Sequence, residues 1–333
     1  MAGDLSVLTQ QWAQRALSRF GLQWGVDSTR PWDELALRGM LSGAHLGIER
    51  VLRLGKVRRE IRNRGEMRCA LWRIPVPSSS KTPRRGKILW VPGLGDTPIS
   101  WLAVAFAAAS RKGFDELVLL DFPGFHGSLA HSRCITGIDR FFEIASDVVK
   151  ELRPEVVVGH SLGGWLASKA AAGAAAAAAG EGVQKLVLLS PSGICGGPDE
   201  RALWNLEFRS FVEVPDVHEY GNRLFARVPP GWSRVGGLFL PFLSREDTRE
   251  FLDSVEARHF LDEGASADLA RLAGMEIELL WGERDRVVPS RFGAEWVRAL
   301  PQSKLTLWPD IGHMPHLESP VRLVRWLGER ISG

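Results

Sequence analysis

Residues 156–167 read VVVGHSLGGWLA, and in this stretch a serine stands between two glycines where an apolar, β-branched run gives way to helix-forming residues. A Gly-x-Ser-x-Gly sequence between a strand and a helix favours a sharp turn, in which Gly159 and Gly163 avoid the clashes that a side chain would cause. The turn would lift the hydroxyl of Ser161 out at the carboxyl end of a sheet. Leu162 would then begin the helix, with its backbone N–H directed at negative charge that develops beside the serine. This arrangement suits a serine nucleophile with one oxyanion donor.

A serine nucleophile needs a base, and the base needs an acid that orients it. Two later stretches supply both groups just after apolar runs: LLWGERDRVVP contains Asp285, and LWPDIGHMPH contains His313. Alternatives stand beside each of them. Glu283 is close enough to replace Asp285 as the acid, Asp285 could instead cap the helix that follows it, and His316 competes with His313 as the base.

These three stretches together resemble the α/β-hydrolase superfamily, in particular its lidded members: esterases, monoacylglycerol-type lipases and carbon–carbon bond hydrolases. The motifs are GHSLGG, WGERDRVVP and PDIGHMPHLESP, and the similarity extends over residues 57–192 and 272–333. The order Ser, Asp, His along the chain is the one that this topology produces. The resemblance implies that Ser161 is the nucleophile, Asp285 the acid and His313 the base, since His313 directly follows a glycine as the family's base does.

The resemblance also implies a second oxyanion donor in the loop after the third strand, where the family usually has His-Gly. Here the loop reads WVPGLGDTP, with Pro92 in place of the histidine. Because the donor is a backbone N–H, this departure need not abolish it, and Leu94 is the candidate. In DFPGFHGS a second departure puts His126 where the family commonly has glycine, which we expect to reshape the pocket rim. The chemistry needs no metal or organic cofactor.

The elements that would position these residues appear as alternating strand and helix patterns. Apolar runs predict buried strands over 87–91, 116–120, 155–159, 185–189, 277–281 and 304–308. Helical patterns follow over 98–112, 137–152, 162–179, 290–300 and 317–331. Strands that are apolar on both faces and alternate with helices indicate a mostly parallel sheet with helices on both sides. Before them, 56–62 and 67–74 alternate with period two and predict an antiparallel hairpin. The predicted fold class is α/β, with the α/β-hydrolase fold.

The interval between the sixth and seventh predicted strands contains many aromatic residues but no buried-strand run, which predicts an inserted, mostly helical cap or lid. The N-terminal residues show two amphipathic helical patterns, over 5–20 and 28–54, for which packing on the core is preferred over dimerisation or membrane contact. The predicted organisation is therefore an N-terminal helical extension (1–55), a first core part (56–192), a lid (193–271) and a second core part (272–333).

Composition favours a globular protein: of the 333 residues, 45% are hydrophobic and 24% are charged. The three cysteines, Cys69, Cys134 and Cys195, are widely spaced without metal-ligand spacing, which favours a reducing compartment over a disulfide framework or a zinc site. The first residues lack a signal-peptide pattern, and no apolar run reaches about 18 residues. We therefore expect a cytoplasmic protein.

The net charge of +3 is unevenly distributed, because residues 50–85 contain twelve Lys or Arg against two Glu. Such a cluster could contact an anionic membrane peripherally. The simpler interpretation is the solvated face of the hairpin, since the charges alternate with apolar residues. The cluster lacks any nucleic-acid recognition motif, so no nucleic-acid partner is predicted.

The predicted partner is a small hydrophobic ester, because the aromatic and aliphatic density of the predicted lid favours an apolar acyl or aryl pocket. Carbon–carbon bond hydrolysis and acyl-CoA thioester hydrolysis are the alternatives within the same fold. A hydrolase-fold ligand receptor with negligible turnover is an alternative of another class. No pattern in the sequence indicates an oligomeric state.

Overall fold

The computed structural model describes residues 57–64, 67–77, 85–96, 98–122, 137–177, 182–213, 216–230, 232, 246–262 and 266–331. Three features of the sequence lie outside these residues: the two N-terminal helical patterns, the loop with His126, and Cys134. Within the described residues no helix is both long enough and apolar enough to cross a membrane.

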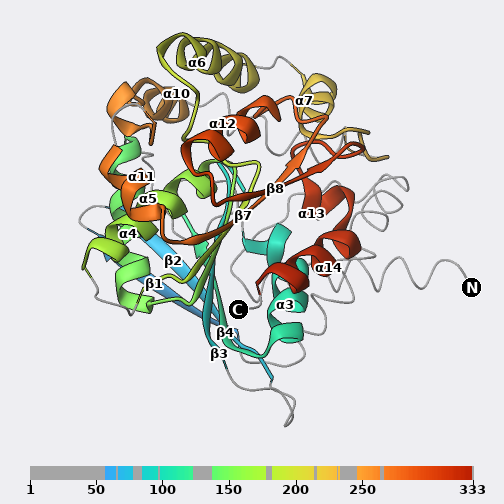
Figure 1. The fold of residues 1–333 in the computed structure, drawn as a ribbon. Coiled ribbons are helices and arrows are strands. Elements are labelled where there is room, and N and C mark those ends of the chain that lie inside the picture. The colour runs from blue at the N-terminus through green and yellow to red at the C-terminus, as the bar shows by residue number, and fades with distance from the viewer. Residues whose placement is uncertain are drawn as a thin grey trace, which may run out of the picture.

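The centre of the molecule is a sheet of eight described strands in the order β1-β2-β4-β3-β5-β6-β7-β8 (Figure 1). Six neighbouring strands are parallel, and β1 and β2 add an antiparallel hairpin at one edge. The predicted hairpin and the predicted mostly parallel sheet are both confirmed. The strands are β1 (Arg58–Arg64), β2 (Met67–Pro75), β3 (Arg85–Val91), β4 (Phe114–Asp121), β5 (Val156–His160), β6 (Lys185–Leu189), β7 (Glu276–Gly282) and β8 (Lys304–Trp308).

Helices cover both faces of the sheet, because alternate strand residues point to opposite sides and both sides are apolar. In β3, for example, Leu89 belongs to one buried cluster and Trp90 to the other. The Leu89 cluster includes residues of α4 (Ile138–Leu152), α5 (Leu162–Ala177) and α12 (Arg291–Ala299). The Trp90 cluster includes residues of α3 (Pro98–Lys112) and α14 (Pro320–Arg330).

The C-terminal helical pattern differs from the expected single helix over 317–331. The chain instead forms α13 (Pro315–Glu318) and then α14, separated at Ser319. Pro320 is responsible, since a proline has no N–H to donate and its ring favours the first turn of a new helix.

Helices also form the described residues between β6 and β7. They are α6 (Pro198–Val212), α7 (Val217–Leu224), α10 (Glu246–Asp253), the short 3₁₀ helix η2 (Ala257–His259) and α11 (Ser266–Leu272). In Figure 1, α6, α7 and α10 lie at the top of the view, beyond the end of the sheet. Seven aromatic side chains of this interval that the structure describes are buried: Trp204, Phe208, Tyr220, Phe225, Trp232, Phe251 and Phe260. The rings of Trp204 and Phe208 stack, with centroids 5.0 Å apart.

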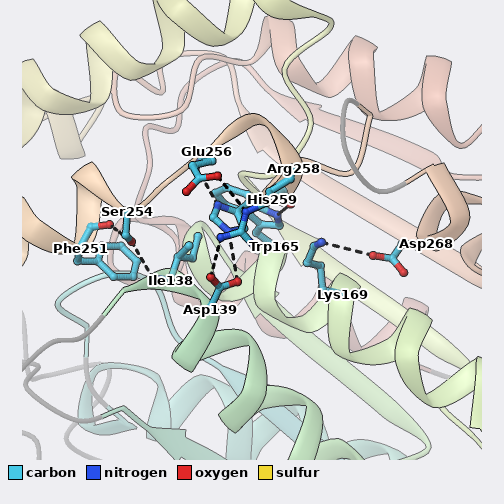
Figure 2. Close-up of polar contacts among 10 residues, drawn as sticks. All are labelled: Ile138, Asp139, Trp165, Lys169, Phe251, Ser254, Glu256, Arg258, His259 and Asp268. Carbon is cyan, nitrogen blue, oxygen red and sulfur yellow. Dashed lines mark hydrogen bonds and ion pairs between the residues drawn. The ribbon is translucent and has the colours of Figure 1, made fainter.

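The second half of this interval is fastened to α4 and α5 (Figure 2). At the start of α4, the backbone N–H of Ile138 donates to Ser254 Oγ at 2.9 Å, and Arg258 pairs with Asp139 at 3.0 Å. On α5, the indole N–H of Trp165 donates to the backbone carbonyl of His259 at 3.1 Å. The helix that follows Ser161 therefore carries part of the predicted lid.

Some of the basic residues at 50–85 form ion pairs within the hairpin and with its neighbours. Arg73 of β2 binds both carboxylate oxygens of Glu116 on β4, at 2.9 and 2.7 Å. Arg62 of β1 pairs with Glu60 and with Glu151 of α4, each at 2.8 Å. These contacts give Arg62 and Arg73 a role within the fold.

Candidate active site

The turn between β5 and α5 has the strained geometry expected of it. Ser161 follows the last residue of β5 with φ at +53°, in the left-handed region that side chains rarely adopt. A Cβ on Gly159 would lie 2.6 Å from the carbonyl oxygen of Gly163, and a Cβ on Gly163 would lie 2.2 Å from that of Val91. Both positions therefore require glycine. Ser161 itself is only 4% exposed, so its hydroxyl lies beneath other parts of the chain rather than on the surface.

Asp285 and His313 are brought together at the same end of the sheet. Asp285 follows β7, His313 follows β8, and Asp285 Oδ2 lies 2.7 Å from His313 Nδ1. The second oxygen of Asp285 accepts hydrogen bonds from the backbone N–H groups of Val287 and Val288, both at 2.9 Å. Because a carboxylate oxygen can only accept a hydrogen bond, Nδ1 of His313 is the donor and carries the proton. Nε2 is then the ring nitrogen with a free lone pair.

The alternative acid and base are placed differently. Glu283 is exposed, and its backbone N–H donates to the backbone carbonyl of Trp308. Asp285 is buried, and its carboxylate accepts from the ring of His313. The ring of His316 stacks on Trp101 with centroids 3.6 Å apart. Burial in this stack, together with the neighbouring histidines, holds the pKa of His316 well below its usual range. The geometry favours Asp285 and His313 as the acid–base pair.

His160 joins the serine turn to the loop of His313. Its Nε2 lies 2.9 Å from the backbone carbonyl oxygen of His313, and the two rings are 4.7 Å apart. Because a carbonyl can only accept, Nε2 of His160 carries the proton. Burial, and then the proximity of His313, keep the pKa of His160 well below its usual range, so the ring stays neutral. The residue before Ser161 thus helps to hold His313 in place.

The loop after β3 lies against Ser161. A Cβ on Gly93 would come within 3.2 Å of Ser161 Cβ, so the absence of a side chain permits this close approach. Asp96 fixes the loop, because its carboxylate accepts from Ser100 Oγ at 2.5 Å and from Trp101 Nε1 at 2.6 Å. Leu94 lies in this loop, one residue after Gly93. Leu162 is the first residue of α5. Both candidate oxyanion donors are therefore next to the serine turn.

Two contributors to the site were not identified from the sequence. Glu318 accepts hydrogen bonds from the backbone N–H of Gly312, next to His313, and from that of Ala226. The backbone carbonyl of Leu224 accepts from the His313 N–H at 2.7 Å. Glu318 stands in the motif PDIGHMPHLESP, which is a signal that could have found it, but Leu224 has no comparable signal.

The arrangement can support nucleophilic attack by a serine, with a histidine as proton acceptor and a carboxylate that orients it. The strained turn places Ser161 at the N-terminus of α5, where backbone N–H groups favour negative charge. Within the part of the chain that the structure describes, no group of three or more His, Cys, Asp or Glu side chains could hold a metal ion.

Comparison with known proteins identifies the fold and the family of the chain. The chain has no significant match among curated protein sequences. A similar solved structure is a putative lipase from Acinetobacter baumannii, with TM-score 0.60 and 16% identity over 90% of this chain and 96% of that one. Another is a probable hydrolytic enzyme from Pseudomonas aeruginosa, with TM-score 0.60 and 20% identity over 83% and 94%. A third is an esterase from Exiguobacterium antarcticum, with TM-score 0.57 and 15% identity over 79% and 95%. The sequence profile of the alpha/beta hydrolase family matches residues 88–326, and the chain therefore belongs to that family.

Proposed function

We propose that this protein is a serine hydrolase that cleaves carboxylic esters of hydrophobic acyl or aryl groups through an acyl-enzyme intermediate. His313 takes the proton of Ser161 as the serine oxygen attacks the ester carbonyl. Asp285 fixes the histidine tautomer and stabilises its positive charge. The backbone N–H groups of Leu94 and Leu162 hold the oxyanion of the tetrahedral intermediate.

The rest of the cycle uses the same groups. His313 returns the proton to the leaving alcohol oxygen as the carbon–oxygen bond breaks, which leaves the acyl group on Ser161. A water molecule, deprotonated by His313, then attacks the acyl carbon and releases the acid and the free serine. The observation that carries the proposal is the 2.7 Å contact between Asp285 and His313, in a loop that His160 ties to the serine turn.

The apolar character of the substrate is supported by the helical interval between β6 and β7. Its buried aromatic residues are part of the same apolar cluster as α5, the helix that begins directly after Ser161. A buried serine next to an apolar cluster favours a substrate with an apolar acyl or aryl group over a charged one. The similar structures described as a lipase and an esterase are consistent with this substrate class.

The test is the initial rate of hydrolysis over p-nitrophenyl esters from acetyl to palmitoyl. We expect turnover that peaks at one chain length and is abolished in Ser161→Ala. Ser168→Ala is the matched control, because Ser168 is also a buried serine of α5, but its hydroxyl donates to the backbone carbonyl of Gly164 within the helix. Equal rates in both variants would contradict the proposal.

The alternatives give different results in the same series. A carbon–carbon bond hydrolase or a thioesterase would leave the esters largely intact and turn over vinylogous diketones or acyl-CoA thioesters, with the same loss in Ser161→Ala. A non-catalytic receptor would be stabilised against heat by one of these compounds without forming product, because a ligand that binds only the native state raises the melting temperature.

A further inference from the structure

Glu318 connects the His313 loop to the chain segment that follows α7. Its Oε1 accepts from the backbone N–H of Gly312 at 2.9 Å, and its Oε2 accepts from the backbone N–H of Ala226 at 2.8 Å. The two segments also meet directly, because the His313 N–H donates to the Leu224 carbonyl at 2.7 Å. One carboxylate therefore spans the base's loop and the helical interval between β6 and β7.

The two segments lie too close together to admit a side chain at position 312. A Cβ on Gly312 would lie 2.6 Å from the backbone nitrogen of Ala226 and 2.8 Å from the carbonyl oxygen of Leu224. Gly312 thus permits the backbone of the His313 loop to pack directly against the backbone of residues 224–226. Glu318 accepts from one N–H of each segment, that of Gly312 and that of Ala226. A shift of the segment after α7 would be transmitted to the residue next to His313.

We propose that Glu318 is a positioning residue that couples the segment Leu224–Ala226 to His313, so that the general base is correctly placed only when this segment is seated. The inference rests on the proposed function, in which His313 is the base. Glu318 acts through His313 and does not touch the substrate.

The ionised form of Glu318 is the one that makes both bonds. A carboxylate offers two full acceptors, whereas a neutral carboxyl keeps one good acceptor and turns the other oxygen into a donor. Burial, reinforced by the nearby Asp285 carboxylate and opposed by the backbone bonds from Ala226, Gly312 and Met314, raises the pKa of Glu318 to about 6. Acidification through this pKa should therefore loosen the coupling.

The experiment compares Glu318→Gln with wild type on the ester that wild type hydrolyses fastest. The glutamine is nearly isosteric, but its amide nitrogen cannot accept, so one of the two backbone N–H groups loses its partner. We expect kcat to fall by roughly ten- to a hundred-fold, because small displacements of a catalytic group are costly, while KM changes little. The plot of kcat against pH should also show one ionisation fewer on its acidic side, since the glutamine does not titrate.

The matched control is Asp262→Asn. The Asp262 carboxylate also accepts two backbone N–H groups, those of Cys195 at 3.1 Å and Gly196 at 2.6 Å, at the base of the same helical interval. If the two variants lose activity alike, or if the pH profile of Glu318→Gln runs parallel to that of wild type, Glu318 has only a structural role and the proposal is wrong. Glu318→Asp serves in place of the glutamine variant if that variant does not fold, with an intermediate loss of kcat expected.

The proposed function and this coupling fail in different ways. A wild-type protein that turns over no ester, thioester or diketone would overturn the proposed function, and with it any catalytic positioning by Glu318. A wild type that is active, with a Glu318→Gln variant of unchanged kcat and pH profile, would overturn the coupling alone.

Discussion

Replacing Gly163 by alanine tests the idea that the serine turn requires close contact between α5 and the end of β3. The added Cβ would lie 2.2 Å from the carbonyl oxygen of Val91 and 2.3 Å from that of Pro92, whereas real Cβ atoms keep more than 3.0 Å from such neighbours. The end of β3 would have to move by at least about 0.8 Å. Overpacking of this kind typically costs about 1–3 kcal/mol.

At about 2–4 °C for each kcal/mol, we expect the melting temperature to fall by roughly 2–12 °C. The displaced segment leads into the loop that contains Leu94, so kcat on the best ester should fall as well, by about ten-fold or more. Calorimetry and initial rates measure the two effects. Gly173→Ala is the matched control on the same helix, because nothing lies within 4 Å of the Cβ it would add.

The control should act in the opposite direction, since alanine is favoured over glycine inside a helix by about 1 kcal/mol. Gly173→Ala is therefore expected to melt at a slightly higher temperature than wild type, with full activity. A Gly163→Ala variant that melts no lower than wild type and keeps its kcat would refute the close-contact account of the turn.

Three further predictions concern the surroundings of the site. His316 is held neutral in the folded state, so the free energy of unfolding decreases as the pH falls below 6.5, where the unfolded chain binds the proton. His316→Phe keeps the ring stack on Trp101, and its melting temperature should fall less than that of wild type between pH 7.5 and 5.5. An equal fall in both proteins would contradict the assignment. Burial raises the pKa of Cys195 to about 12, so peptide mapping should find this thiol unalkylated by iodoacetamide at pH 8 until the protein unfolds. Arg73→Lys should cost about 1 kcal/mol in urea denaturation, because lysine cannot reproduce the bidentate bond to Glu116, and unchanged stability would show that the pair contributes little.

The sheet could be predicted from the sequence because its strands are apolar on both faces. A short apolar run such as 185–189 buries all its side chains when it lies inside a sheet that is covered on both faces. The run has the same bounds as the observed strand β6. The hairpin followed from period two in the same way. The division of the last helix at Ser319 has a signal in Pro320, which overrides the helical periodicity of residues 317–331.

The site was predictable to the extent that its residues are marked by short motifs. Gly159 and Gly163 flank Ser161 at a distance of two positions, and Gly312 directly precedes His313. Close backbone contacts at all three glycines leave no room for a side chain. The bond from His160 to the carbonyl of His313 joins residues 153 positions apart, and a single sequence has no signal for such a contact. Glu318 lies in the stretch PDIGHMPHLESP, but its contact with Ala226 joins residues 92 positions apart, for which a single sequence has no signal.

The central claim is that Ser161 is a nucleophile activated by His313, and covalent capture tests it most directly. The protein is incubated with a fluorophosphonate, which modifies activated serines, and the adduct is located by mass spectrometry of the intact chain and its peptides. The account predicts one adduct, on Ser161, that is absent from Ser161→Ala and forms far more slowly in His313→Ala. No adduct on Ser161, or equally rapid labelling in His313→Ala, would contradict it.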